Sequence, residues 1–280
     1  MFVSGTIKEA RAYLQKQKKA GKSVGFVPTM GALHEGHLSL LRCARSENDV
    51  TVVSIFVNPI QFNNPADLVK YPRDLHRDLD SLEKEHCDLV FTPSASEMYP
   101  EPETREYDFG DLTRVMEGKC RPGHFNGVAV VVQKLFGIIQ PGRAYFGEKD
   151  FQQLAVIRRL VEMENIPVEI VACPTKREPD GLAMSSRNQR LSHAQRKTAP
   201  ILYQVLKQAR SEYGDIPLHS ITTKAIKTLN NQPEMQVEYF TFVDASTLQP
   251  LTEHQKVSGI RICVAATLGS VRLIDNIPVG

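Results

Sequence analysis

The sequence predicts an α/β protein with a doubly wound parallel sheet, followed by a smaller α+β domain. In residues 1–175, short apolar runs alternate with amphipathic stretches, which is typical of strands and helices in a parallel sheet. In residues 176–280, a turn-rich segment precedes helical patterns and then alternating strands. A chain of 280 residues with 41% hydrophobic content is long and apolar enough for two such cores. The first domain is therefore expected to be Rossmann-like.

The first elements follow from apolar periodicity and from the residues that interrupt it. Thr6 is the expected N-cap of an amphipathic helix over residues 6–19. Residues 24–27 form an apolar run typical of a buried strand, and Pro28 should end it because proline supplies no amide hydrogen to a sheet. Residues 50–57 are almost wholly apolar and rich in valine, so we expect a strand covered on both faces.

A charged helix is predicted over residues 74–85, with Leu75, Leu79 and Leu82 on its inward face. Residues 94–121 are polar and contain several prolines, which indicates loops around one short helix or strand. The other elements expected in the first domain are strands at 88–91, 143–146 and 168–172 and helices at 126–139 and 151–164.

The second domain is expected to open with a polar loop over residues 176–190. Ser192 and Gln195 then have the spacing of a capping box, which predicts one long helix to about Tyr213. The remaining elements expected are a helix near 220–230 and antiparallel strands at 237–243, 260–266 and 271–274, the last two joined by a hairpin turn at Gly269 and Ser270.

Charge and cysteine content exclude several classes of protein. The net charge of +2 provides no overall field that would attract nucleic acid or a membrane surface. The five cysteines are scattered without a CxxC pair, which is typical of reduced thiols in the cytosol rather than of disulfides or a zinc site. No signal peptide is visible, and the most apolar stretch, residues 127–139, is too short to span a bilayer. We therefore expect a cytoplasmic protein.

The stretch from Val24 to Leu41 places a glycine-containing loop between a strand and a helix N-terminus. Unpaired backbone amides and the helix dipole favour an anion there, and His34 and His37 add donors at the same point. This arrangement suits a nucleoside triphosphate. A solvated turn and a metal site are the alternatives, although HEGH has no third ligand nearby and is not the HExxH zinc pattern.

Two further loops carry groups that suit a polyphosphate. Residues 147–150 follow a predicted strand, where Lys149 offers a cation and Asp150 could accept from ribose hydroxyls. Residues 184–187 present serine hydroxyls and the fork of an arginine. Taken alone, residues 147–150 are better explained as a charged β–α turn, and residues 184–187 could be no more than a loop that enters a helix.

Neutral amides that suit a small polar substrate are carried by Asn58, Gln61 and Gln153. Residues 121–125 form another loop with basic groups, for which a solvated turn is an equal alternative. Ligands of doubly wound sheets gather outside the carboxyl ends of the strands, where HEGH, residues 58–61 and residues 147–150 are predicted to lie. We therefore expect these three segments to share one site.

Taken together, these segments resemble the pantothenate synthetase (pantoate–β-alanine ligase) family over nearly the whole chain. The motifs that carry the resemblance are PTMGALHEGHLSL at 28–40, SIFVNPIQF at 54–62, YPR at 71–73, RPGHF at 121–125, FGEKDFQQL at 146–154 and DGLAMSSRN at 180–188. HEGH and MSSR also resemble the two signature motifs of the wider nucleotidylyltransferase and class I tRNA-synthetase superfamily.

The resemblance implies ATP-dependent condensation of (R)-pantoate with β-alanine to pantothenate, with release of AMP and pyrophosphate through a pantoyl-adenylate. It implies Mg²⁺ beside ATP, a homodimer, and a C-terminal domain over residues 176–280 that acts as a lid, since an acyl-adenylate must be shielded from water. A nucleotidylyltransferase acting on a phosphorylated small molecule and a non-catalytic nucleotide-binding regulator are the alternative functions. Gln61 and Gln153 argue against the former, because neutral amides do not suit a phosphorylated substrate.

The resemblance also implies a role for each candidate residue. Catalysis would fall to His34, His37 (the proton donor), Lys149 and Arg187. ATP would be bound by Met30, Gly31, Ala32, Leu33, His34, Glu35, Gly36, His37, Gly147, Glu148, Lys149, Asp150, Lys176, Met184, Ser185, Ser186 and Arg187. Pantoate would be held by Gln61 and Gln153, and β-alanine by Gln61 and Asn58. No residue is assigned as a metal ligand.

Overall fold

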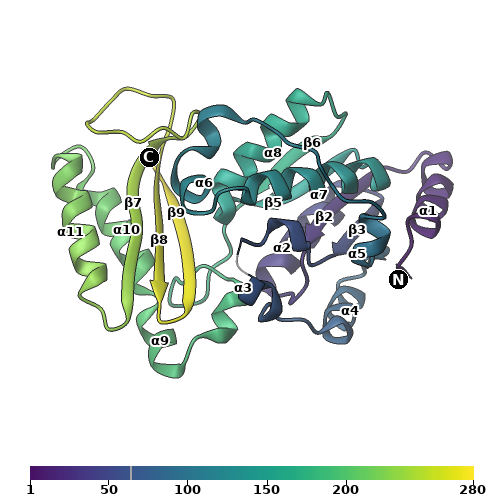
Figure 1. Cartoon of the computed structure of the whole chain (residues 1–280), viewed down its shortest axis with the longest axis horizontal. Helices are drawn as coiled ribbons and strands as arrows, with labels where there is room; N and C mark the ends of the chain where they lie inside the picture. The colour runs from purple at the N-terminus through teal and green to yellow at the C-terminus, as the bar shows by residue number, and fades with distance from the viewer. Residues whose placement is uncertain (64) are drawn as a thin grey trace. The chain divides into compact units, whose positions relative to one another are not determined.

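The computed structural model describes residues 1–63 and 65–280, which divide into two compact units (Figure 1). The N-terminal unit comprises residues 1–109, 121–148 and 156–174. The C-terminal unit comprises residues 110–120, 149–155 and 175–280. Both units are therefore discontinuous in sequence.

A six-stranded parallel sheet forms the centre of the N-terminal unit, with strand order β1-β4-β3-β2-β5-β6. Its strands are β1 (Phe2–Ser4), β2 (Val24–Thr29), β3 (Val50–Ile55), β4 (Leu89–Phe91), β5 (Arg143–Gly147) and β6 (Glu169–Cys173). The chain runs outward from β2 through β3 to β4, and then crosses to β5 on the other side of β2. This reversal between β2 and β5 confirms the doubly wound prediction, although β1 was not foreseen.

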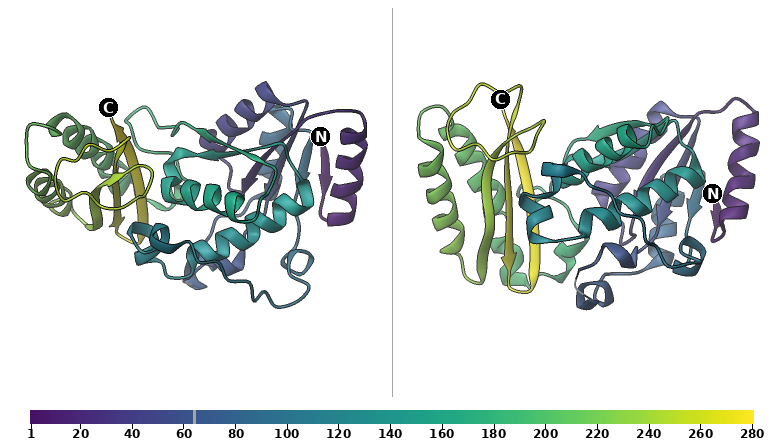
Figure 2. Two further views of the ribbon diagram at one scale, coloured as in Figure 1. Left: turned by 90° about the horizontal axis from the view of Figure 1, so that it is seen from above. Right: turned by 45° about the horizontal axis from the view of Figure 1, so that its top comes forward.

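Helices cover both faces of this sheet (Figure 2). The longer helices of the unit are α1 (Ile7–Lys19), α2 (Glu35–Glu47), α4 (Leu75–Lys84), α7 (His124–Ile139) and most of α8 (Phe151–Met163); the shorter ones are η1 (Pro59–Gln61), α3 (Pro65–Val69) and α5 (Ala95–Met98). Successive residues of β2 point to opposite faces. Phe26 meets Phe136 of α7 with ring centroids 6.3 Å apart, whereas Val27 packs in a cluster with Leu41 of α2.

The N-cap prediction at Thr6 is confirmed, because its side chain accepts a hydrogen bond from Glu9 N at 3.3 Å. The prediction that Pro28 ends its strand is wrong, since β2 continues to Thr29 with Pro28 opposite Ser54 of β3. The pairing of β2 with β5 covers only Gly25 and Phe26. At Pro28 the missing amide hydrogen therefore interrupts no ladder on the β5 side.

Three other expectations for the N-terminal half differ from the structure. Strand β3 ends at Ile55 rather than at Val57. Leu75, the first residue of α4, is 47% exposed instead of inward-facing, whereas Asp78, one turn further along, is 2% exposed. Residues 94–121 contain three short helical segments rather than one element: α5, η2 (Gly110–Thr113) and α6 (Met116–Cys120).

A three-stranded antiparallel sheet, β7-β8-β9, forms the centre of the C-terminal unit. Its strands are β7 (Met235–Asp244), β8 (Ile260–Leu268) and β9 (Val271–Val279), and its helices are η3 (Glu148–Asp150, shared between the units), η4 (Ser186–Arg190), α9 (His193–Thr198), α10 (Ile201–Glu212) and α11 (Leu218–Asn230). The hairpin prediction is confirmed, since Leu268 pairs with Val271 across a turn in which Gly269 has a φ of +57°.

The capping box at Ser192 and Gln195 is present, but the single long helix predicted after it is wrong. The chain forms α9 and α10 with a break at Ala199 and Pro200. Pro200 has no N–H with which to continue the helical ladder, so a new helix starts there.

Each face of the C-terminal sheet has its own cover (Figure 1). Leu273 and Ile277 of β9 face a core built with α10 and α11. On the opposite face, Cys263 of β8 packs with Met116 of α6 and Phe151 at the start of α8. Residues 110–120 and 149–155 thus cover the second face of this sheet, which explains why they belong to the C-terminal unit. Within residues 1–63 and 65–280, no helix has both the length and the apolarity needed to cross a bilayer.

Candidate active site

The two histidines of HEGH form a reciprocal cap at the start of α2. Gly36 N donates to His34 Nδ1 at 3.1 Å, and His34 N donates to His37 Nδ1 at 3.4 Å. The two rings lie with their centroids 4.0 Å apart and their planes tilted by 33°. Because both Nδ1 atoms accept, a neutral ring carries its proton on Nε2, which makes Nε2–H the donor of each histidine.

The loop before α2 is held in a left-handed conformation by a distant carboxylate. Gly31 and Ala32 have φ values of +79° and +49°. Asp78 of α4 accepts from Ala32 N at 2.9 Å and from Leu33 N at 2.7 Å. The expectation that this loop offers unpaired amides is therefore wrong for Ala32 and Leu33, since a carboxylate inside the protein already satisfies both. Burial raises the pKa of Asp78 above its ordinary value, although the two amide donors oppose this shift.

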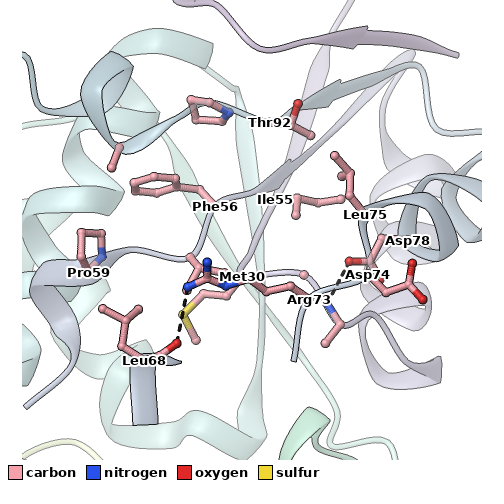
Figure 3. Close-up of a pocket in the computed structure, with 15 residues that line it drawn as sticks. Met30, Ile55, Phe56, Pro59, Leu68, Arg73, Asp74, Leu75, Asp78 and Thr92 are labelled. Carbon is pink, nitrogen blue, oxygen red and sulfur yellow. Dashed lines mark hydrogen bonds between the residues drawn. The ribbon is translucent and has the colours of Figure 1, made fainter. Parts of the chain in front are cut away.

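A pocket of about 400 Å³ adjoins this loop at the carboxyl ends of β2, β3 and β4 (Figure 3). Met30, Ile55 and Thr92 line it from these three strand ends. Arg73, which also lines the pocket, donates to Leu68 O at 3.4 Å. The carboxyl ends of parallel strands are where doubly wound sheets bind their ligands.

Gln61 is tied to Met30 and to Asn58 in the same unit. Gln61 Nε2 lies 3.0 Å from Met30 Sδ, and Asn58 Nδ2 donates to Gln61 Oε1 at 3.1 Å. Asn58, which is 1% exposed, also donates to Gly127 O at 3.1 Å and accepts from Tyr99 OH at 2.8 Å. The amide of Asn58 is thus engaged on both its atoms, and its contacts fix the orientation of the Gln61 side chain.

The RPGHF loop supports Gln61 from its other side. Arg121 Nη1 donates to His124 Nε2 at 3.0 Å, because a guanidinium can only donate. His124 therefore carries its proton on Nδ1, which donates to Gln61 O at 2.9 Å. A Cβ added at Gly127 would lie 2.6 Å from Ile60 O, so glycine allows α7 to pass this close to η1. The alternative of a merely solvated turn does not hold for this loop.

In the C-terminal unit, Lys149 and Asp150 lie in η3, directly before α8, on which Gln153 lies. Lys149 Nζ is 3.6 Å from Asp150 Oδ1, and its side chain is 18% exposed. The neighbouring Gln152 is buried: it donates to Val115 O at 2.9 Å and accepts from Glu117 N at 2.9 Å. The start of α8 is therefore anchored by a residue that the sequence did not single out. Gly147 and Glu148 precede Lys149 at the end of β5 and the start of η3.

The structure brings Lys176 beside Met184, because Met184 N donates to Lys176 O at 3.0 Å. Arg177 and Ala183 form an isolated antiparallel bridge between these two positions. Ser185 then caps η4 by accepting from Arg187 N at 3.3 Å. The candidate ATP-binding residues of this segment thus form one compact loop.

The candidate residues are therefore distributed over both units. The N-terminal unit joins HEGH, Met30, Asn58 and Gln61, and the C-terminal unit contains the lysine of η3 and the 176–187 loop. Of the supporting residues, Asp78 was not identified from the sequence, and His124 was identified only as part of the basic loop 121–125. The available signal was a carboxylate on the inward side of α4 and a histidine at the start of an apolar helix.

The described residues contain no group of three or more His, Cys, Asp or Glu side chains placed to hold a metal ion. All five cysteines are free, and Cys120 is exposed. Burial raises the pKa of Cys87, Cys173 and Cys263 to about 12, so these thiols stay protonated near neutral pH.

Comparison with known proteins gives one consistent family. The family description "Pantoate-beta-alanine ligase" matches residues 3–278. A pantothenate synthetase of Azobacteroides pseudotrichonymphae is 48% identical over 278 residues, covering 99% of each chain. A pantothenate synthetase of Porphyromonas gingivalis is 48% identical over 277 residues, again covering 99% of each.

Solved structures show the same similarity. A pantothenate synthetase from Thermus thermophilus has a TM-score of 0.93 and 47% identity, covering 100% of this chain and 99% of that one. A pantoate–β-alanine ligase from Francisella tularensis, solved in complex with "Beta-gamma ATP" and β-alanine, has a TM-score of 0.84 and 39% identity, covering 99% and 97%. The similarity therefore extends over both units.

Proposed function

This chain belongs to the pantoate–β-alanine ligase family, and on that premise we propose how it makes pantothenate from pantoate and β-alanine. The reaction proceeds in two steps through an enzyme-bound pantoyl-adenylate. The observation that carries this proposal is the contact of Gln61 with Met30, in the loop that leads into HEGH. It brings a neutral amide for the acid substrate to the segment that carries the proposed polyphosphate donors. A nucleotidylyltransferase would need cations rather than amides at that second position.

In the first step, a carboxylate oxygen of pantoate attacks the α-phosphorus of ATP, and the bond from that phosphorus to the bridging oxygen breaks. Negative charge then grows on the leaving pyrophosphate, where prearranged donors stabilise the transition state. The Nε2–H groups of His34 and His37 supply such donors, with His37 as the proton donor. Lys149 and Arg187 add charge-assisted donors.

The proposed ATP site comprises residues 30–37, 147–150, 176 and 184–187. The ATP analogue bound to the Francisella tularensis ligase supports ATP as the co-substrate. Lys176 takes part through its backbone. The hydrogen bond from Met184 N to its carbonyl supports this role by fixing the main chain at this position. In this proposal Asp150 accepts from ribose hydroxyls.

Gln61 and Gln153 hold pantoate, and Gln61 and Asn58 serve β-alanine. Asn58 is engaged by Tyr99, Gly127 and Gln61, so its contribution to β-alanine binding passes through the orientation of Gln61. β-Alanine bound to the Francisella tularensis ligase supports the identity of the second substrate.

In the second step, the uncharged amine of β-alanine attacks the acyl carbon of the adenylate and displaces AMP. Orientation of bound reactants can supply on the order of 7 kcal/mol or more of such a barrier. We assign residues 1–175 to nucleotide and pantoate binding and residues 176–280 to a lid that shields the adenylate from water.

Mg²⁺ is the proposed metal, entering with ATP. Because no cluster of metal-binding side chains is present among the described residues, phosphate oxygens and water would form most of its coordination. The ion would neutralise part of the charge that develops on the pyrophosphate. The donors named above act on the remaining phosphate oxygens.

We further propose a cytoplasmic homodimer. Five free cysteines support a reducing compartment, and light scattering after gel filtration measures the oligomeric state.

The two-step scheme is tested by isotope exchange between pyrophosphate and ATP. Exchange should require pantoate and proceed without β-alanine, whereas net AMP formation should require both acids. Absence of exchange, together with absence of bound adenylate in a single-turnover quench, would indicate a concerted reaction instead.

A further inference from the structure

Two adjacent buried polar residues lie in the middle of β9 and have no part in the function proposed above. Asp275 is 4% exposed and Asn276 is 5% exposed. Successive residues of a strand point to opposite faces. Strand β9 therefore places a carboxylate on the face covered by α10 and α11, and a carboxamide on the face covered by residues 110–120 and 149–155.

Asn276 holds the main chain at Lys149. Asn276 Nδ2 donates to Lys149 O at 2.8 Å, while Arg261 Nη1 donates to Asn276 Oδ1 at 2.7 Å. Because a guanidinium can only donate, the oxygen of the Asn276 carboxamide must face Arg261. Its NH₂ group therefore faces Lys149 O. Arg261 is itself stacked on Phe151, with its guanidinium carbon 4.1 Å from the ring centroid.

Asp275 holds the second candidate ATP-binding segment. Its two oxygens accept from Arg177 Nη1 at 2.6 Å and from Arg177 Nη2 at 2.9 Å, a bidentate pair of the strong kind. Arg177 also donates to Gly181 O at 3.0 Å and lies over the ring of Tyr203 at 3.9 Å. Gly181 has a φ of +94°, which glycine adopts readily, and it turns the chain toward Met184.

The two halves of this arrangement are directly connected. Asn276 N donates to Asp275 Oδ1 at 2.7 Å, and Arg177 Nη2 donates to Asn276 O at 3.2 Å. Both residues lie on a strand that pairs along its whole length with β8. One rigid strand thus contacts η3 through Asn276 and the 176–187 loop through Arg177.

We infer that Asp275 and Asn276 are positioning residues for ATP, setting Lys149 and the 184–187 loop at a fixed separation. This inference rests on the proposed function, which gives Lys149 and Arg187 their roles on the phosphates. Lys149 and the 184–187 loop are at least 35 positions apart in the chain, so local structure alone does not fix their distance. A misplacement of about 1 Å in such a site can reduce the rate on the order of 100-fold.

Asn276→Asp tests the donor to Lys149 with little change in shape. The variant keeps an acceptor for Arg261 but replaces the NH₂ group with an oxygen that faces Lys149 O. We expect pantoate-dependent ATP–pyrophosphate exchange to fall on the order of 10- to 100-fold in kcat/KM for ATP, with little change in KM for pantoate. Asn276→Ala should behave alike, and Asp275→Asn should raise KM for ATP.

Val264→Ala is the matched control, because Val264 pairs with Asp275 across β8 and β9 but points into the core. It should lower the melting temperature while leaving exchange near the wild-type rate. If the Asn276 variants behave like the control, with a lower melting temperature and exchange near the wild-type rate, the residue is merely structural and the inference is wrong.

A double-mutant cycle separates this inference from the proposed function. If Asn276 acts through Lys149, Asn276→Asp should cost little further exchange in a Lys149→Ala background. Fully additive losses, or wild-type exchange in Asn276→Asp, would overturn the inference while leaving the proposed function intact. Wild-type exchange in Lys149→Ala alone would instead overturn the proposed role of Lys149, and the positioning of that residue would lose its purpose.

Discussion

Removal of the Asp78 carboxylate should destabilise the loop before α2 by a calculable amount. Asp78→Ala leaves the amides of Ala32 and Leu33 without their acceptor, and both residues are only 7% exposed. A buried donor left unsatisfied costs about 1–3 kcal/mol, so two such donors cost about 2–6 kcal/mol. Because the substitution also removes a buried charge, we expect the net loss of unfolding free energy to lie at about 2–4 kcal/mol.

Two further variants should change the unfolding free energy by smaller amounts. Asp78→Asn keeps one acceptor oxygen but turns an NH₂ group toward the second amide, so it should recover about half of the loss. Asp80 lies on the same helix with its side chain 54% exposed and pairs only with exposed His76 among the ion pairs of the described chain. Asp80→Ala should therefore change the unfolding free energy by no more than about 0.5 kcal/mol.

The assay combines urea unfolding with native-state hydrogen exchange. Exchange at the Ala32 and Leu33 amides reports the opening of the loop itself, whereas urea reports the larger cooperative unit. Both amides should lose protection in Asp78→Ala, and pantoate-dependent ATP–pyrophosphate exchange should fall because Met30 to His37 lose their support. Wild-type protection of both amides in a folded Asp78→Ala protein would refute the reasoning.

The pH dependence of this contribution has a definite sign. Because burial raises the pKa of Asp78, the folded protein binds this proton more tightly than the unfolded chain does. The advantage of the wild type over Asp78→Asn in unfolding free energy should therefore decrease as pH rises from the ordinary carboxyl pKa through the raised value, and stay constant above it. An advantage that grows over that interval would contradict the assigned shift.

Three other outcomes follow from the site. His37→Ala should keep the fold by circular dichroism but reduce adenylation by roughly 100- to 1,000-fold, the usual cost of about 2.7–4 kcal/mol for one lost transition-state donor; near-normal activity would remove His37 from the mechanism. Gln61→Ala should raise KM for pantoate and β-alanine while MgATP affinity, measured by calorimetry, stays nearly unchanged; an equal loss of MgATP affinity would contradict the division of roles. Alkylation of the native protein should modify exposed Cys120 first and spare the three buried thiols with raised pKa, with activity largely retained, as mass spectrometry and the exchange assay would show.

Local signals in the sequence sufficed for most of the fold. The apolar, β-branched run at β3 and the caps at Thr6 and Ser192 depend on neighbouring residues only. The strand and both caps were therefore predicted, whereas the end of β3 and the break in the helix after Ser192 were not. Strand β1 spans only Phe2–Ser4 and exists because β4 pairs with it, which no local pattern reveals. Likewise, Pro28 is tolerated because β5 does not extend that far along β2.

The sequence indicated candidate ligand-binding side chains, but it did not indicate the residues that hold those side chains and their loops in place. HEGH and MSSR are recognisable because each motif carries two or more hydrogen-bonding side chains within four consecutive residues. Asp78 and Asn276, by contrast, contact main-chain atoms far away in sequence: the Ala32 amide and the Lys149 carbonyl. A main-chain atom has the same chemistry in every residue, so the sequence of the contacted segment contains no sign of its partner.

The same physical requirement explains why these supports are buried and polar. Catalytic loops at strand ends have few neighbours of their own, so their backbone groups need partners from elements that are rigid for other reasons. Helix α4 and strand β9 supply such partners. Apolar packing fixes the positions of both elements, through Leu82 in α4 and through Leu273 in β9. A buried carboxylate or carboxamide is costly to leave unpaired, so each one constrains the loop it contacts to a narrow range of positions. Asn58 has the same supporting role, but it contacts a side-chain amide, that of Gln61, rather than the main chain. We therefore expect substitutions of Asn58 to change substrate affinity through the orientation of Gln61.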